Sequence, residues 1–535
     1  MSIAPGLLCV TMQPTPGLSL DQFHEWYNNE HGPTRLRLPA IFSNGLRYQA
    51  TDGLQPAFLA AYDVTAMSHL ETETYTALRA NRSPREGETI GRVDVARYLY
   101  DLVHTSQSLL FKPIERLTDE EAEGLVTVAV EITPTDAPGA GDEYQKWYIE
   151  EHVGLLAKVP GWLRSRFYKT SSIESGQAAI KYFALHDYTR ENGLGGDLHK
   201  ASMNTPRRSK VFEEYIASKH RRTYSLFYVF GPAPRDLYPL SRLPPDASFK
   251  SQDERTVTTA GPDAKIDSYI TTSDALAIPY RLEGNPSPSA PCVAFSNSLL
   301  TSLHMWDPFI RILKEHRPDL KILRYDFRGR NAIPHPGTLN LVTDDLKLIL
   351  DALRITKLHA LIGVSMGGVT TLNFALQHPS RLRKFIACDF NCTSSPANTQ
   401  AWKDRVAVAE ADSGRGIKTL AEQTVSRWFH PKSMGKPETV RWITDMVAAN
   451  DVGGFKNSCT VLWDYDLKPK MKSCTVPGLL VVGSDDAKGA VVKAMDGFKS
   501  ILSEDGTELR LVPETGHLPM CEDPQAFWET VKDFI

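Results

Sequence analysis

The sequence has few cysteines, no surplus of basic residues and no long hydrophobic run. Seven of its 535 residues are cysteine, and only Cys9 precedes Cys292, so a disulfide framework is excluded and reduced thiols in a cytoplasmic protein are expected. Lys and Arg number 60 against 64 Asp and Glu, a net charge of −4; without a basic surplus to contact phosphates, no nucleic-acid partner is predicted. No apolar run reaches the ~18 residues that cross a bilayer, and the first ten residues do not have the pattern of a signal peptide, so no membrane partner is predicted either.

What is present is an ordinary globular composition, with 41% hydrophobic and 23% charged residues. This composition excludes a chain that is largely disordered or fibrous. At about 150 residues per domain, the length predicts three or four domains.

The first half of the chain contains an internal repeat. Residues 23–39 read FHEWYNNEHGPTRLRLP, and residues 144–160 read YQKWYIEEHVGLLAKVP. Five identities share one offset of 121 residues: Trp26, Tyr27, Glu30, His31 and Pro39 recur as Trp147, Tyr148, Glu151, His152 and Pro160. A strand-like stretch precedes each copy, at 6–13 and 125–132, and alternating aromatic residues follow at 97–103 and 223–230. This order predicts two units, each a sheet with helices over one face.

The arrangement resembles the dimeric α/β-barrel superfamily, and most nearly its EthD-like branch, in which ferredoxin-like units pair their sheets. The resemblance covers residues 5–232. It implies two ferredoxin-like α+β repeats, at 1–118 and 119–232, that form an intramolecular dimeric α/β barrel.

Two interpretations of the repeated Glu-His pair remain open. Glu30–His31 and Glu151–His152 could be acid/base pairs beside a barrel cavity, which makes His31 and His152 candidates for an N-terminal pocket. Alternatively, because neighbouring helical residues point about 100° apart, the Trp, Tyr and His stripe is core packing with satisfied imidazoles. The N-terminal half would then be an assembly module only, through which the chain could form a homo-oligomer.

A proline-rich segment separates the two halves. It holds six prolines between 232 and 262 with little apolar periodicity, so 233–265 is predicted to be a semi-extended linker. Beyond it, apolar runs at 291–297, 321–327, 358–365, 382–390, 478–486 and 508–514 alternate with helical patterns. This alternation predicts an α/β fold with a mostly parallel, doubly wound sheet in 266–535, whose site lies beyond the carboxyl ends of the strands.

The most specific motif lies in this second half. The stretch Gly363-Val364-Ser365-Met366-Gly367 joins the apolar run LHALIGV to the helical stretch VTTLNFALQH. Small residues on both sides of Ser365 let the chain turn sharply from strand into helix, which exposes the hydroxyl at the helix N-terminus. The motif therefore predicts a nucleophile elbow with Ser365 as the nucleophile.

A serine nucleophile needs a base, and the base needs an orienting acid. His517 lies in the loop between the last strand and the last helix, where the chain order of serine, acid and histidine puts the base, and His430 is its rival. Asp486, at the end of the preceding strand, is the first candidate for the acid. Asp485 beside it and Asp389, after the strand that follows the elbow, are the alternatives.

The sequence around these positions resembles the α/β-hydrolase family, and within it the 3-oxoadipate enol-lactone hydrolases. The matching segments are SNSLLTSLHMWDP at 296–308, TLAEQTVSRWFHP at 419–431, GFKNSCTVLWDYDL at 454–467 and GHLPMCEDPQAF at 516–527. The match implies the triad Ser365, Asp486 and His517, together with a helical cap at about 392–472.

The resemblance also implies how a substrate is held. Two backbone N–H groups form an oxyanion hole, one from Met366 just after the nucleophile and the other from Leu299. Asn297 and Ser298 stand where ordinary hydrolases have His-Gly, and Trp428 in the cap faces the substrate.

Three features depart from the family. The turn that usually reads Asp-x-Arg-Gly-His-Gly is DFRGRN at 326–331, Ser458-Cys459 replace a pair of cysteines in the cap, and the N-terminal half has no counterpart in the bacterial enzymes. His430, close to Trp428, is a further candidate for substrate contact.

The sequence thus predicts a serine hydrolase that opens a small-molecule lactone or ester through an acyl-enzyme, without a metal or organic cofactor. One alternative keeps the triad but cleaves a C–C bond in a vinylogous diketone. In another, the N-terminal barrel binds or transforms a polyketide-like ligand and the hydrolase processes its product.

Overall fold

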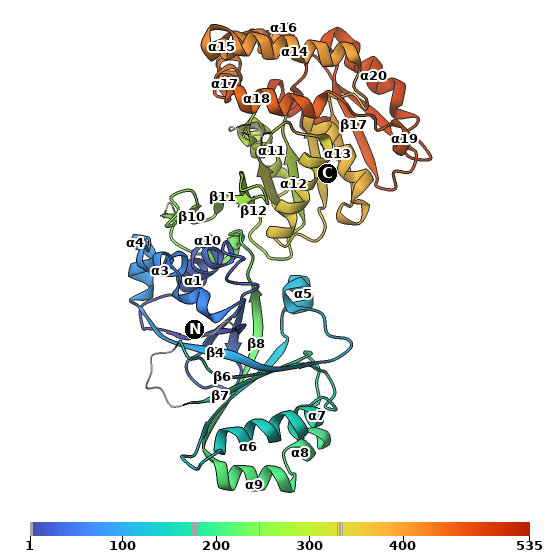
Figure 1. Ribbon diagram of the computed structural model, residues 1–535. Helices are drawn as coiled ribbons and strands as arrows, with labels where there is room; N and C mark the ends of the chain where they lie inside the picture. Colours follow the sequence, from blue (N-terminus) through green and yellow to red (C-terminus); the bar gives the residue numbers. More distant parts are fainter. Residues whose placement is uncertain (1–3, 174–179, 246, 329, 331–332, 334) are drawn as a thin grey trace. The chain divides into compact units, whose positions relative to one another are not determined.

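The structure is a computed structural model that describes residues 4–173, 180–245, 247–328, 330, 333 and 335–535. The chain divides into two compact units, one made of Met1–Pro234 with Lys250–Gln252 and the other of Arg235–Phe249 with Asp253–Ile535. The main division lies two residues beyond the boundary that the composition predicts. Figure 1 shows both units along the chain, from blue to red.

Within the described residues, eight antiparallel strands of the first unit close into a barrel, in the order β1-β3-β2-β8-β5-β7-β6-β4. They are β1 (Gly6–Pro14), β2 (Leu46–Ala50), β3 (Phe58–Val64), β4 (Val93–Gln107), β5 (Val126–Pro134), β6 (Trp162–Thr170), β7 (Tyr182–Tyr188) and β8 (Ile216–Val229). Both halves repeat one order, β4-β1-β3-β2 and β8-β5-β7-β6. The halves join at two seams, where β2 pairs with β8 and β4 pairs with β6.

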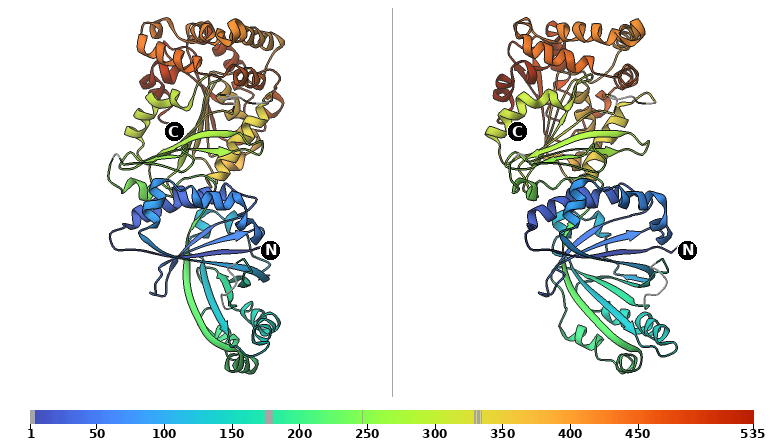
Figure 2. Two further views of the ribbon diagram at one scale, coloured as in Figure 1. Left: turned by 60° about the vertical axis from the view of Figure 1, so that its left-hand side comes forward. Right: turned by 90° about the vertical axis from the view of Figure 1, so that its left-hand side faces the viewer.

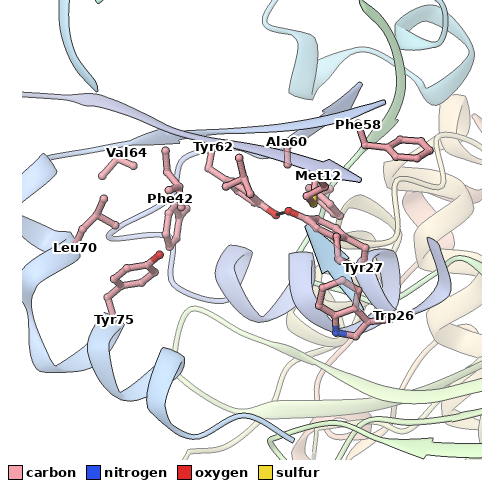
Figure 3. Close-up of a cluster of buried hydrophobic side chains, with 14 of the residues drawn as sticks. Met12, Trp26, Tyr27, Phe42, Phe58, Ala60, Tyr62, Val64, Leu70 and Tyr75 are labelled. Carbon is pink, nitrogen blue, oxygen red and sulfur yellow. Dashed lines mark hydrogen bonds between the residues drawn. The ribbon is translucent and has the colours of Figure 1, made fainter. Parts of the chain in front are cut away.

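Alternate residues of the barrel strands pack into two different hydrophobic clusters, because successive strand side chains point to opposite faces of the sheet. Leu7 and Cys9 belong to a cluster that strands of both halves share. Leu8, Val10 and Met12 belong to a second cluster, which packs against the helices of the first half. Figure 3 shows this second cluster, in which the hydroxyls of Tyr62 and Tyr27 are hydrogen-bonded at 3.1 Å.

The repeated Tyr-x-x-Glu-His motif forms a one-turn π-helix in each half, η1 (Tyr27–His31) and η4 (Tyr148–His152), between two α-helical segments. The neighbouring helices are α1 (Leu20–Trp26), α2 (Gly32–Leu36), α3 (Glu73–Ala80) and α4 (Pro84–Ile90) in the first half, and α6 (Ala140–Trp147), α7 (Val153–Leu156), α8 (Asp197–Ser202) and α9 (Pro206–Tyr215) in the second. In the first half α1 contacts α4, and in the second α6 contacts α9 along its length. The views of Figure 2 show helices along one face of the strands in each half.

The second unit is built on a ten-stranded sheet of the order β18-β17-β16-β15-β13-β14-β12-β11-β10-β9, counted over the described residues. Its strands are β9 (Ser248–Lys250), β10 (Val257–Thr259), β11 (Lys265–Thr271), β12 (Ala277–Gly284), β13 (Cys292–Ser296), β14 (Lys321–Tyr325), β15 (Ala360–Val364), β16 (Phe385–Cys388), β17 (Gly478–Gly483) and β18 (Glu508–Val512). β13 to β18 are parallel and coincide with the six predicted apolar runs, whereas β10, β11 and β12 pair antiparallel. Every residue of β13, β15 and β16 is buried, as the strands of a sheet covered on both faces must be.

Helices pack on the sheet and extend beyond it. α11 (Asp307–His316) packs with α22 (Pro524–Val531), and α12 (Leu339–Ala352) packs with α13 (Met366–Gln377). Between β16 and β17, in the region predicted as a cap, the chain forms α14 (Pro396–Glu410), α15 (Gly416–Trp428), α16 (Pro431–Met434), α17 (Pro437–Ala448), α18 (Val452–Cys459) and α19 (Lys468–Met471). Across the described residues, no helix is both long enough and apolar enough to cross a membrane.

The segment predicted as a linker is more structured than its composition suggests. Residues 233–265 contain α10 (Leu237–Ser241) and the short strands β9 and β10 at the end of the sheet. Leu237, Leu240 and Leu243 are buried, so a bare semi-extended linker is the wrong description of this stretch. Local periodicity could not reveal this order, because the apolar residues are few. Position 246 lies outside the described residues.

Candidate active site

Ser365 occupies the turn between β15 and α13. Its backbone has φ 59° and ψ −118°, a region that residues with a side chain rarely adopt. Two glycines make the turn possible. A Cβ on Gly363 would lie 2.2 Å from the carbonyl oxygen of Gly367, and a Cβ on Gly367 would lie 2.1 Å from that of Ser296. The strand–turn–helix geometry therefore requires the small residues that flank the serine.

His517 and Asp486 form a hydrogen-bonded pair. His517 follows β18 and Asp486 follows β17, so both lie beyond the carboxyl ends of parallel strands, as Ser365 does beyond β15. The imidazole Nδ1 lies 2.8 Å from the Oδ2 of Asp486, and this carboxylate is 3% exposed. A carboxylate at Nδ1 fixes the imidazole tautomer and leaves Nε2 to accept a proton.

The cap holds the histidine loop in place. The backbone N–H of His517 donates to the carbonyl of Trp428 at 2.7 Å, and the two rings are 5.4 Å apart between centroids. A Cβ on Gly516 would lie only 2.0 Å from the same carbonyl oxygen, so this position needs glycine. The cap residue Trp428 thus lies directly beside the imidazole.

A second carboxyl group, Asp389, lies behind the first. One of its oxygens accepts the backbone N–H of Gly483 at 2.8 Å, and its Oδ2 is buried without a donor. Burial and the adjacent carboxyl of Asp486 raise the pKa of Asp389 well above its usual range. A raised pKa favours a protonated carboxyl, which can donate a hydrogen bond to a neighbouring carboxylate, so the position of Asp389 suits the support of Asp486.

The other predicted candidates for acid and base have different partners. Asp485 is exposed and accepts a hydrogen bond from the hydroxyl of Ser484 at 2.7 Å. His430 caps α16, where its Nδ1 accepts the backbone N–H of Lys432 at 3.1 Å. Its Nε2 lies 3.6 Å from Asp485. The structure gives His430 a capping role, and its contact with a substrate stays a prediction.

The two predicted oxyanion-hole residues line one cavity. This cavity of about 250 Å³ is bounded by Leu299 and Met366 and also by Ser298, Leu300, Thr301, Phe327, Arg330, Asn450, Phe455 and Ser458. The predicted role of Ser298 is compatible with this position. Asn297 is different: it is fully buried, donates to the carbonyl of Tyr325 at 2.8 Å and accepts from the indole of Trp306 at 3.0 Å. Its carboxamide holds the segment in place, and its contact with a substrate stays a prediction.

Arg330 is a cavity residue that the sequence argument missed. Its guanidinium lies 3.3 Å from the carbonyl of Leu300 and 3.2 Å from that of Met446. Burial lowers its pKa, and the charge of Asp326 counteracts this. The signal was present in the departure of the 326–331 turn from its usual pattern. Gly329 and Asn331 of that turn lie outside the described residues.

The two N-terminal candidates differ from each other. The Nδ1 of His31 lies 2.6 Å from a carboxylate oxygen of Glu86. The Nδ1 of His152 is buried without a hydrogen-bond partner, and its ring lines a cavity of about 510 Å³. Core packing predicts that each imidazole has a hydrogen-bond partner at Nδ1. His31 has such a partner, whereas His152 does not.

Comparison with known proteins shows what the second unit resembles. A family model described as the alpha/beta hydrolase fold matches residues 292–524. The "3-oxoadipate enol-lactonase 1" of Acinetobacter baylyi is 29% identical over 254 residues, which are 47% of this chain and 91% of that protein. The "3-oxoadipate enol-lactonase 2" of the same organism is 28% identical over 266 residues, 49% of this chain and 94% of that protein.

A solved structure matches the same region. The enol-lactonase from Burkholderia xenovorans is 28% identical with a TM-score of 0.45, and the match covers 50% of this chain and 98% of that one. Residues 292–524 therefore have the α/β-hydrolase fold and resemble 3-oxoadipate enol-lactonases.

Proposed function

We propose that the α/β-hydrolase unit is a serine hydrolase that opens a lactone or ester through an acyl-enzyme, and that its substrate carries a carboxylate. The observation that carries the proposal is the His517–Asp486 hydrogen bond of 2.8 Å at the sheet edge where the Ser365 elbow lies. The hydrolase and enol-lactonase relatives support the reaction class.

The proposed reaction has two steps, acylation of Ser365 and hydrolysis of the acyl-enzyme. The hydroxyl of Ser365 attacks the carbonyl carbon while His517 takes its proton, and Asp486 stabilises the imidazolium. The backbone N–H groups of Leu299 and Met366 hold the oxyanion. The ring C–O bond then breaks and the leaving oxygen takes the proton from His517. Water, activated by the same imidazole, attacks the acyl-enzyme and releases the acid with the serine restored.

The carboxylate of the substrate is inferred from Arg330. This is the cation among the residues that bound the cavity with Leu299 and Met366. A guanidinium recognises a carboxylate through charge-assisted hydrogen bonds, which are stronger than neutral ones.

Product analysis on matched substrates tests the proposal. Enol-lactones, aryl esters and β-diketones are compared with the wild type and with Ser365→Ala, and mass spectrometry follows acylation of Ser365. Acylation and hydrolysis of lactones or esters are expected, whereas cleavage of diketones alone would replace the proposal by C–C hydrolysis. Arg330→Met should raise KM for carboxylate-bearing esters but not for their methyl esters, and Arg330→Lys should restore part of the difference.

We also propose that the N-terminal barrel consists of two ferredoxin-like repeats, at about 1–118 and 119–232, of the EthD-like kind. The identical strand orders of the two halves and the repeated motif support this assignment. Fragments provide the test. Residues 1–118 leave the seam edges of β2 and β4 unpaired and should associate or aggregate, whereas 1–234 should sediment as one compact species. A well-behaved monomer of 1–118 would contradict this.

A further inference from the structure

The second helices of the two barrel halves begin in the same way. The hydroxyl of Ser83 caps α4 by accepting the N–H of Glu86 at 3.0 Å. The hydroxyl of Thr205 caps α9 by accepting the N–H of Arg208 at 3.2 Å. A proline follows the cap in both helices. At the third position after the cap, the first half has the carboxylate of Glu86 and the second half has the guanidinium of Arg208.

In the first half this carboxylate completes the repeated histidine. Glu86 and His31 are both buried, with 2.6 Å between a carboxylate oxygen and Nδ1. Burial opposes ionisation of Glu86, but the hydrogen bond and charge of His31, with Arg35 and Arg82, lower its pKa to about 2. The first half thus contains an internal anion for its histidine.

In the second half the corresponding histidine faces a cavity. His152 is 7% exposed and its Nδ1 has no hydrogen-bond partner. Arg208 from α9 and Lys219 and Arg221 from β8 line the same cavity of about 510 Å³, and no Asp or Glu is among its described lining residues. Burial first, then His186, Arg208 and Lys219, lower the pKa of His152 to about 3. The described residues that line this cavity thus include three cationic side chains and no carboxylate.

Apart from His186 and His199, the rest of the cavity wall is apolar or aromatic. Trp147 stacks on His152 with 4.5 Å between ring centroids, and the Arg208 guanidinium lies 4.2 Å from the ring centre of Phe212. Val128, Val130 and Leu156 contribute aliphatic surface. Small-molecule sites combine an apolar lining with a few polar anchors, and the wall of this cavity has both.

We propose that this cavity binds a small organic carboxylate with an apolar body, and that the ligand's carboxylate takes the place beside His152 that Glu86 takes beside His31. The guanidinium of Arg208 supplies the matching fork of donors, and Lys219 adds a second positive charge. The apolar body of the ligand lies against Trp147 and Phe212. This site belongs to the barrel alone and does not depend on the function proposed for the hydrolase unit.

Binding of matched acids and amides by the full chain tests this proposal. Isothermal titration calorimetry compares acetate, phenylacetate and naphthylacetate with phenylacetamide, which has the shape of phenylacetate without its charge. Affinity should increase with the apolar body, and phenylacetate should bind at least about tenfold more tightly than the amide. Equal affinity for acid and amide, binding of none of the acids, or equally tight binding of inorganic phosphate would each overturn it.

Two substitutions on one helix locate the site. Arg208→Glu installs the charge that the first half has at this position and should abolish phenylacetate binding. Lys210→Glu makes the same change of charge at an exposed position of α9 outside the cavity and should leave binding unchanged. Arg208→Gln should weaken binding about tenfold, which guards against a folding defect in the glutamate variant.

Ester hydrolysis, measured in parallel, separates this site from the hydrolase unit, because none of these variants should alter it. If phenylacetate binding survives in Arg208→Glu, or if Lys210→Glu weakens it equally, the carboxylate does not bind in this cavity and the proposal fails. Loss of hydrolysis in Ser365→Ala with intact phenylacetate binding would leave the barrel site standing whatever becomes of the proposed reaction.

Discussion

Both units contain a histidine hydrogen-bonded to a carboxylate, but the two pairs lie in different surroundings. His31 and Glu86 lie 2.6 Å apart and His517 and Asp486 lie 2.8 Å apart. The first pair is buried in the barrel half, between helices and strands. The second pair lies on the loops that follow β17 and β18. The turn that carries Ser365 follows β15, at the same end of the parallel strands. An acid–histidine pair therefore indicates catalysis only when the fold adds a nucleophile and access to it.

The largest expected difference between the two pairs is in the reaction rate, and substitutions at each site test it. Ser365→Ala and His517→Ala should each reduce kcat by about 10⁴-fold or more, because members of a triad act as one unit. His31→Ala should leave kcat unchanged and lower only the stability of the barrel. Kinetics with a small test ester measure all three. If Ser365→Ala kept a tenth of the wild-type kcat, the triad assignment would be wrong.

A second comparison separates the two carboxyls behind His517. Asp486→Asn should lower kcat by roughly 10³-fold or more, because the imidazole loses its orienting charge. Asp389→Asn should cost less than about tenfold, because an amide imitates a protonated carboxyl that donates to Asp486. The reverse order would make Asp389 the triad acid. Asp389→Ala, which cannot donate, should lie between the two.

The buried pair of the barrel should appear in stability instead of rate. Glu86→Ala leaves the buried Nδ1 of His31 without its hydrogen-bond partner, and an unsatisfied buried polar group costs about 1–3 kcal/mol. Glu88→Ala removes an exposed carboxylate from the same helix and should have little effect. Chemical denaturation, followed by near-ultraviolet circular dichroism, measures both. Equal losses for the two variants would show that the pair adds nothing specific.

The smallest expected effect is a pH dependence of barrel stability. Burial, followed by the charges of nearby cations, lowers the pKa of His31 from 6.5 to about 4, and of His152 to about 3. Between pH 6.5 and 4 the unfolded chain binds protons that the folded barrel does not, so stability falls as the pH falls through this window. The barrel should melt at a lower temperature at pH 5 than at pH 7. An unchanged melting temperature would contradict the assignment of neutral, buried imidazoles.

The parallel strands and the serine turn could be predicted from sequence because their signals are local. β15 is five buried residues followed at once by Ser365, and the repeat is visible in a short motif. The hydrogen-bond partners of the oxyanion segment could not be predicted in this way. Trp306 and Tyr325 bind the carboxamide of Asn297, and no local pattern indicates these contacts.

The features that could not be predicted depend on side chains that meet only in the folded chain. His31 and Glu86 are 55 residues apart, and no periodicity links them. The π-helical turn of the motif also has no pattern that distinguishes it from an α-helix. The raised pKa of Asp389 follows from burial beside Asp486, which depends on the packing around both strands.

The two seams of the barrel lie within a single polypeptide, and this has an evolutionary consequence. In a barrel formed by two identical subunits, every substitution appears twice, so both sites must change together. Because one chain encodes both halves here, a carboxylate could be kept at position 86 while a guanidinium arose at its counterpart, 208. Covalent linkage removes the requirement for symmetry, so one half can preserve the scaffold while the other diverges toward a new ligand.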